Sequence, residues 1–188
     1  MATTPPRAND PPPAEAALAL LAAYHACIRD LLVHLEDLLA DGRRSPDDRE
    51  AVARDLLEGF DCALSVHLGD EEDDVFPAIL AASDAPARRA QAFELVSSLL
   101  VEHREMGELW TALRVALGAM GGGIALPFPE LTARRFLDLC RRHIAREERE
   151  LADLARRIPP ERLGQVVDSI SRRHARAPGC CPRGERRS

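Results

Sequence analysis

Apolar residues recur at steps of three and four along four long segments, and this spacing limits the possible folds more than any other feature of the chain. An α-helix turns once every 3.6 residues, so side chains three and four positions apart lie on one face. Alanine and leucine dominate the apolar residues, and only 4% of the chain is aromatic, which favours helix over strand. The pattern predicts an all-α protein: an up-down-up-down four-helix bundle followed by a short fifth helix at the C-terminal end.

Prolines, glycines and helix-capping residues divide the 188 residues into four parts. We expect a disordered, proline-rich leader over residues 1–13, a helical bundle over 14–157, a short accessory helix within 158–174 and a disordered tail over 175–188. Within the bundle, Ser45 and Pro46 are typical of a helix start. Three consecutive glycines, residues 121–123, mark the longest internal loop.

The charge of the chain argues against two classes of partner. Acidic residues number 31 and basic residues 25, which gives a formal net charge of −6. Such a chain has no basic field that would hold nucleic acid or an anionic membrane. We find no apolar stretch of the roughly 20 residues that a membrane span needs, so the expected protein is soluble.

The five cysteines do not have the spacing of a disulfide framework. Cys27, Cys62 and Cys140 fall inside predicted helices, where small core residues are the simplest interpretation. Cys180 and Cys181 are adjacent in the predicted tail, where an inert role is favoured over metal binding or oxidant sensing. This usage predicts a reducing compartment, and therefore a cytoplasmic protein.

Ionisable side chains interrupt the apolar stripe of each long helix. One histidine lies on the first stripe and one on the third, while the second and fourth each carry a histidine and a glutamate four residues later; the six residues are His25, His67, Glu71, His103, His143 and Glu147. Helix lengths allow the four histidines to meet at one depth. Burying these groups without partners would cost several kcal/mol each. Two cations would compensate, because imidazole suits iron and a carboxylate can bridge two metals.

This arrangement resembles the haemerythrin HHE cation-binding domain over residues 14–157. The resemblance lies in the two His-x-x-x-Glu motifs, with a separate histidine on each of the other two long helices. It implies two non-haem iron ions bridged by Glu71 and Glu147. It also implies that His25 and His67 bind one iron, and that His103 and His143 bind the other.

Gly107 departs from the pattern of haemerythrins that carry oxygen, which have a further histidine one turn after the histidine of the third helix. We therefore expect binding or sensing of dioxygen, nitric oxide or iron rather than reversible carriage. An enzyme that acts on peroxide or oxidises ferrous iron is the alternative, and a metal-free bundle with His–Glu pairs is the third possibility. The expected partner is dioxygen, another small diatomic molecule or peroxide.

The remaining polar and large side chains have simpler interpretations. His34 and His174 are expected at the surface. Trp110 and Met106 are expected to fill the core. Four glutamates beside the stripes are expected on solvated helix faces: Glu72, Glu102, Glu105 and Glu148.

Overall fold

The computed structural model describes residues 13–40, 44–177 and 179–180, and this part of the chain is helical, without strands. The all-α prediction is confirmed. Residues 1–12 of the predicted leader and residues 178 and 181–188 of the predicted tail lie outside the described residues, whereas Pro13, assigned to the leader, begins the first helix. The elements are α1 (Pro13–Ala40), α2 (Pro46–Asp70), η1 (Glu71–Val75), α3 (Phe76–Ala81), α4 (Pro86–Gly121), α5 (Glu130–Arg146), η2 (Glu147–Leu151), α6 (Ala152–Ala155) and α7 (Pro160–Arg176).

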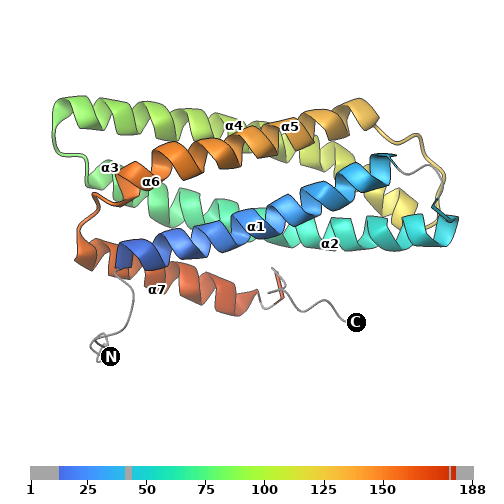
Figure 1. Ribbon diagram of the computed structural model, residues 1–188, viewed down its shortest axis with the longest axis horizontal. Helices are drawn as coiled ribbons and strands as arrows, with labels where there is room; N and C mark the ends of the chain where they lie inside the picture. The colour runs from blue at the N-terminus through green and yellow to red at the C-terminus, as the bar shows by residue number, and fades with distance from the viewer. Residues whose placement is uncertain (1–12, 41–43, 178, 181–188) are drawn as a thin grey trace.

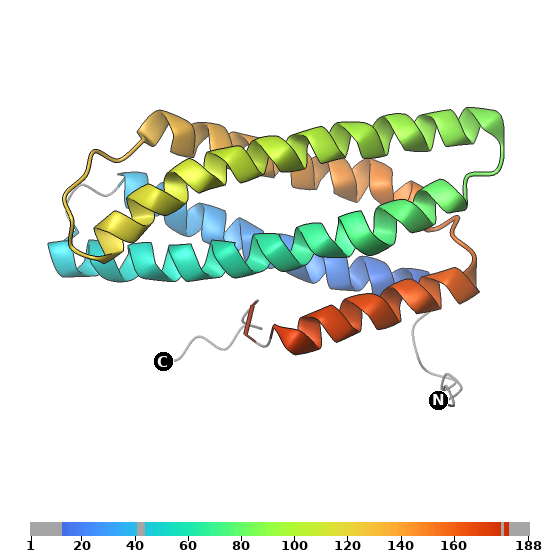
Figure 2. The same ribbon diagram turned by 180° about the vertical axis from the view of Figure 1, so that it is seen from behind.

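Four long helical segments lie side by side along the long axis of the molecule (Figure 1). Helix α2 packs against α1 and α4, and α5 packs against α4 and α1. The π-helical turns η1 and η2 continue α2 and α5 into α3 and α6. Helix α7 lies along the outer side of α1, next to the end of α2, as the view from behind also shows (Figure 2).

Local sequence signals account for the helix ends. The Ser45 side chain accepts a hydrogen bond from the backbone N–H of Asp48 at 3.1 Å, and Pro46 occupies the first turn of α2. Helix α4 ends at Gly121, and Gly123 has a φ of +70°, a conformation that favours glycine. The predicted starts and stops therefore follow from capping and backbone freedom.

The core consists of two apolar clusters at different levels of the bundle. The first contains Leu32, Phe60, Trp110 and Phe136, and the second contains Leu21, Val75, Phe76, Leu99 and Leu151. Trp110 and Met106 belong to the first cluster, as expected. On each long helix the stripe histidine lies between a residue of one cluster and a residue of the other. The four imidazoles are thus brought to one level, with apolar packing on both sides.

The expectation that no apolar segment is long enough to span a membrane is wrong for α1. Its residues Glu15–Ala40 are long and apolar enough to cross a membrane by length and composition alone, with a mean hydropathy of 1.6. A core helix of a soluble protein passes the same test. In this structure Leu21, Ile28 and Leu32 are buried in the two clusters, and His25 interrupts the apolar face.

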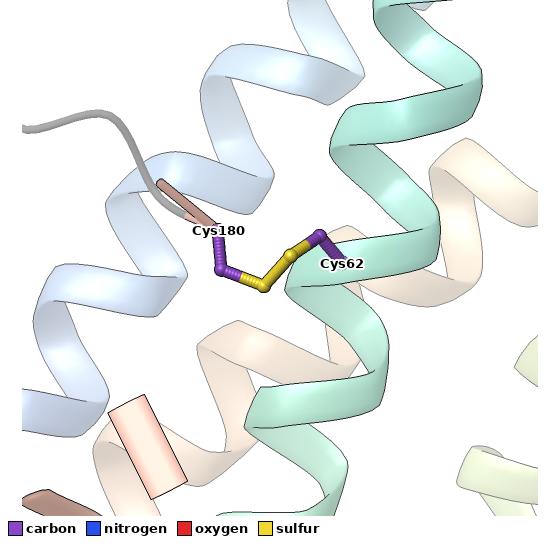
Figure 3. The surroundings of a disulfide bond; sticks show 2 residues. All are labelled: Cys62 and Cys180. Carbon is purple, nitrogen blue, oxygen red and sulfur yellow. A yellow bond between two sulfur atoms is a disulfide. The ribbon is translucent and has the colours of Figure 1, made fainter. Parts of the chain in front are cut away.

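The cysteine prediction is wrong, because Cys62 of α2 and Cys180 form a disulfide bond (Figure 3). Their Cα atoms lie 5.1 Å apart although 118 positions separate them in sequence. Helix α7 runs back along α1 and so brings Cys180 to α2, a proximity that sequence spacing does not reveal. Cys27 is also disulfide-bonded, and Cys140 is a free, buried thiol. Cysteine usage therefore no longer supports a reducing compartment.

The C-terminal part is also more ordered than predicted. Helix α7 extends to Arg176, beyond the predicted end of the accessory helix. Cys180, assigned to a disordered tail, is only 3% exposed. The physical reason is the same: packing against α1 and α2 orders a polar segment that has little tendency to order by itself.

Candidate metal centre

Six elements supply the six predicted ligands, and the structure brings all of them together. His25 lies in the middle of α1, His67 near the end of α2, His103 in α4 and His143 near the end of α5. Glu71 and Glu147 are the first residues of η1 and η2. Each of the six residues is at most 4% exposed, so the cluster is buried in the bundle.

The two π-helical turns begin at the two clustered glutamates. A π-turn widens the helix by one residue, and such turns often occur at functional sites. Each turn begins with two consecutive glutamates, Glu71–Glu72 in η1 and Glu147–Glu148 in η2. The first of each pair is buried in the cluster, and the second reaches a histidine from outside.

Each buried carboxylate faces one histidine of each predicted pair. Glu71 places Oε1 3.7 Å from Nε2 of His67 and Oε2 3.3 Å from Nε2 of His103. Glu147 places Oε2 3.2 Å from Nε2 of His25 and Oε1 2.9 Å from Nε2 of His143. The two glutamates therefore stand between a His25–His67 half and a His103–His143 half.

Two groups of possible ligand atoms result, and they share both carboxylates. In each group the atoms lie within 4.8 Å of one another. The first group is His25, His67, Glu71 and Glu147; the second is Glu71, His103, His143 and Glu147. This is the arrangement that two bridged cations would need.

Three of the four histidines are held from behind by carboxylates. The Nδ1 atom of His103 lies 2.7 Å from Glu72, that of His143 lies 2.7 Å from Glu102, and that of His25 lies 3.2 Å from Glu148. Such contacts fix the ring orientation and make Nδ1 the donor, so that Nε2 is left as the ligand atom. Glu72 and Glu148 are exposed, as expected of solvated helix faces, and Glu102 is half-buried, but each of the three carboxylates also contacts a histidine of the cluster, which was not predicted.

His67 differs from the other three histidines. Among the described residues its Nδ1 atom has no hydrogen-bond partner. Its ring instead lies parallel to that of Tyr24, with the ring centres 6.3 Å apart and an angle of 6° between the planes. Burial lowers the pKa of His67 to about 3, so the ring is neutral at physiological pH, as a metal ligand must be.

The two buried carboxylates have opposite electrostatic environments. Burial, together with the nearby Glu147 carboxylate, raises the pKa of Glu71 well above its usual range. Burial alone would also raise the pKa of Glu147, but the imidazoles of His103, His143 and His25 hold it well below its usual range. Without a cation, the charge of Glu147 is therefore balanced by imidazoles, whereas Glu71 is driven towards its neutral, protonated form.

The side chains present fit a pair of metal ions. Seven buried atoms of the cluster have no well-formed hydrogen bond within the described part of the chain: Nε2 of His25, both ring nitrogens of His67, and both carboxylate oxygens of Glu71 and Glu147. A metal-free core of hydrogen-bonded His–Glu pairs would satisfy these atoms. Mixed imidazole and carboxylate ligands are the kind that non-haem iron prefers.

A second group of polar residues, which sequence patterns did not indicate, lies beside the cluster. Asp70, which precedes Glu71, is 1% exposed and lies 2.6 Å from Arg173 and 2.5 Å from His174 of α7. Tyr24, which precedes His25, is 5% exposed. His34 is exposed, as predicted, whereas His174 is not a free surface residue. Helical periodicity places Asp70 and Tyr24 beside the ligands, but only the docking of α7 shows their partners.

The comparisons with known proteins agree with this geometry. A family model described as the hemerythrin HHE cation binding domain matches residues 16–155. The match spans α1 to α6, which carry all six clustered side chains, and stops before α7. Comparison with curated proteins and with solved structures gives no match.

Proposed function

The chain belongs to the haemerythrin family of HHE cation-binding domains, and from this premise we propose that it is a non-haem di-iron protein that binds or senses a small diatomic molecule. The four long helices would run up, down, up and down, with the metal centre between the two apolar clusters. One observation carries the proposal. There are two groups of possible ligands, each group contains two histidines, and both groups include the carboxylates of Glu71 and Glu147.

The geometry supports a specific distribution of ligands. His25 and His67 would bind one iron, His103 and His143 would bind the other, and Glu71 and Glu147 would bridge them. When bound, the iron pair would supply exchangeable coordination positions and two electrons for redox chemistry. The chain itself contributes neutral imidazoles, bridging carboxylates and a dry environment.

The surrounding residues would prepare the site before any ligand arrives. Glu72, Glu102 and Glu148 hold three imidazoles with Nε2 directed inward, which reduces the reorganisation that metal binding requires. The apolar clusters on both sides keep bulk water from the carboxylates. Because all six ligands are buried, the site favours a molecule as small as dioxygen, nitric oxide or peroxide.

Gly107 supports sensing rather than reversible oxygen carriage. It is exposed on α4, one turn after His103, and an added Cβ would meet no atom within 4 Å. Neither of the histidines outside the cluster replaces the missing imidazole, since His34 is exposed and His174 contacts Asp70. An iron bound by two histidines would have more exchangeable coordination positions than an iron bound by three.

The test is the metal content of protein purified under air, with an optical spectrum. We expect about two irons per chain, charge-transfer absorption in the near ultraviolet and no haem Soret band. Glu147→Ala should lose most of the iron, because that carboxylate would serve both positions. His34→Ala, an exposed position, is the matched control and should retain it.

Two results would contradict the proposal. Stoichiometric zinc or the absence of metal in the native protein would exclude a di-iron centre. Equal iron retention in Glu147→Ala and His34→Ala would show that the ligand assignment is wrong.

A further inference from the structure

The end of the described chain covers one half of the candidate metal centre. We define the C-terminal strap as residues 173–177 with Gly179 and Cys180. It comprises the last turn of α7 and the described residues after that helix, and it lies outside the segment that the family model matches. Figures 1 and 2 show α7 running beside α1 towards the middle of α2. The strap is therefore an addition to the helices that carry the six clustered side chains.

Ion pairs attach the start of the strap to the end of α2 and to η1. Arg173 lies 2.6 Å from Asp70, 2.7 Å from Asp74 and 3.0 Å from Asp73. Gly69 provides room for this side chain, because an added Cβ there would lie 3.3 Å from Nε of Arg173. Asp70 directly precedes Glu71, and Asp73 and Asp74 follow within one helical turn.

The disulfide bond attaches the other end of the strap. Cys180 is buried against Tyr24 and Val66, and its sulfur is bonded to Cys62 of α2 (Figure 3). Cys62 is partly exposed whereas Cys180 is buried, so Cys62 is the more accessible of the two bonded cysteines. Val66 directly precedes His67, which places this contact next to a predicted metal ligand.

Tyr24 connects the strap to the His25–His67 half. Its ring contacts that of His174, with the ring centres 4.6 Å apart, and it also lies parallel to the ring of His67. His67 is also the ligand whose Nδ1 lacks a carboxylate in the described part of the chain. The orientation of this ring therefore depends on packing, and the strap completes that packing.

We propose that the C-terminal strap is a redox-controlled cover, which opens when a dithiol reduces the Cys62–Cys180 disulfide and then speeds metal exchange in the His25–His67 half. The part concerning metal rests on the proposed function. The other half has carboxylates behind both histidines and has no such dependence on the strap.

The redox step is a thiol–disulfide exchange. A thiolate of the dithiol attacks the sulfur of Cys62, the bond between the two protein sulfurs breaks, and Cys180 leaves as a thiolate that takes up a proton. The second thiol of the reductant then displaces Cys62, which also becomes a thiol. The protein disulfide gains two electrons, and the dithiol becomes a disulfide.

The first measurement follows the cover without reference to metal. The double variant Cys62→Ser/Cys180→Ser lacks this bond, and it is treated with the same dithiol because Cys27 is also disulfide-bonded; in this form it imitates the opened state. Tyr24 is the only tyrosine, so its nitration, followed by peptide mass spectrometry, reports directly on the cover. We expect nitration of Tyr24 and hydrogen exchange in α7 to be about tenfold faster in the double variant. Ser65→Ala, an exposed position on α2, is the matched control and should behave as the native protein.

The second measurement follows release of iron from the loaded protein to a chelator. In the native protein treated with a dithiol, and in the double variant, about half of the iron should leave about tenfold faster while the rest leaves at the unchanged rate. Ser65→Ala without dithiol should release iron as the untreated native protein does.

The outcomes separate this proposal from the proposed function. Protein that binds no iron contradicts the di-iron function, and the nitration experiment still decides whether the strap is a cover. Unchanged nitration and hydrogen exchange in the double variant would overturn the cover. Faster nitration with unchanged iron release, or with equal acceleration of all the iron, would overturn the control of the His25–His67 half.

Discussion

At the scale of single residues, Glu71 and Glu147 have similar positions but unlike environments. Both are first residues of a π-helical turn and both are buried. Imidazoles stabilise the charge of Glu147, whereas Glu71 is placed near a second carboxylate and its pKa is raised. In the metal-free protein the Glu71 carboxylate therefore destabilises the fold, whereas a bound cation would make its negative charge favourable.

Replacing Glu71 with glutamine should separate stability from metal binding. Below pH 4.5 the native carboxyl is protonated whether the chain is folded or unfolded; as the pH rises, the unfolded chain releases its proton first, and stability is lost. The metal-free Glu71→Gln variant avoids this loss and should be more stable than the metal-free native protein by about 1–3 kcal/mol at pH 7. The difference should shrink towards pH 4. Urea unfolding at several pH values measures it.

The matched control for this variant is Glu105→Gln, since Glu105 is exposed and pairs with Arg135. That change should leave stability within about 0.5 kcal/mol. Glu71→Gln should also lose iron. A metal-free Glu71→Gln protein that is less stable than the native chain at pH 7 would contradict the assigned direction of the pKa shift.

At the scale of elements, α7 is held by charges rather than by apolar area alone. Its apolar face, with Leu163, Val166 and Ile170, packs into the second cluster. Its last turns carry Arg173 and His174 to the buried carboxyl of Asp70. A buried carboxylate that loses a partner is costly, so this contact should dominate the docking of the helix.

Arg173→Ala should therefore destabilise the protein by about 1–3 kcal/mol, because it removes one partner of the buried Asp70. Arg156→Ala is the matched control: Arg156 pairs with Asp153 at the surface, and its loss should cost less than about 1 kcal/mol. Chemical denaturation gives both values. Equal effects of the two changes would show that the Arg173–Asp70 contact does not anchor α7.

At the scale of the whole molecule, the two apolar clusters are separated by a polar layer. Phe60, Leu113 and Phe136 lie in one cluster and Phe76 and Leu99 in the other, with the six clustered His and Glu side chains between them. Within the part of the chain that the structure describes, seven polar atoms of that layer lack a well-formed hydrogen bond, and they oppose folding unless a cation satisfies them. Stability of the whole bundle should therefore depend on metal.

Removal of metal with a chelator should lower the melting temperature by about 5–10 °C, because binding to the native state contributes to folding free energy. Differential scanning calorimetry before and after chelation measures the change. The same treatment of Glu147→Ala, which should hold little metal, is the control and should have little effect. An unchanged melting curve after complete removal from the native protein would favour a metal-free core.

The sequence by itself determined the helices and the six buried ionisable positions. Both depend on local regularities: side chains of one helical face repeat every 3.6 residues, and capping residues end helices wherever they occur. His25, His67, His103 and His143 could be assigned to one level from segment lengths, since helical rise per residue is constant. The predicted ligand roles stay predictions until metal is measured.

Only the tertiary structure decided which side chains meet from different elements. In the sequence, Glu72, Glu102 and Glu148 cannot be told from solvated residues. Each contacts a histidine of another helix, and such a partner is visible only once the helices are packed. The Cys62–Cys180 bond and the ion pairs of Asp70 depend on where α7 docks, and they join positions more than 100 residues apart. Periodicity specifies which face of a helix is buried; which partner lies opposite that face depends on the packing of all the helices together.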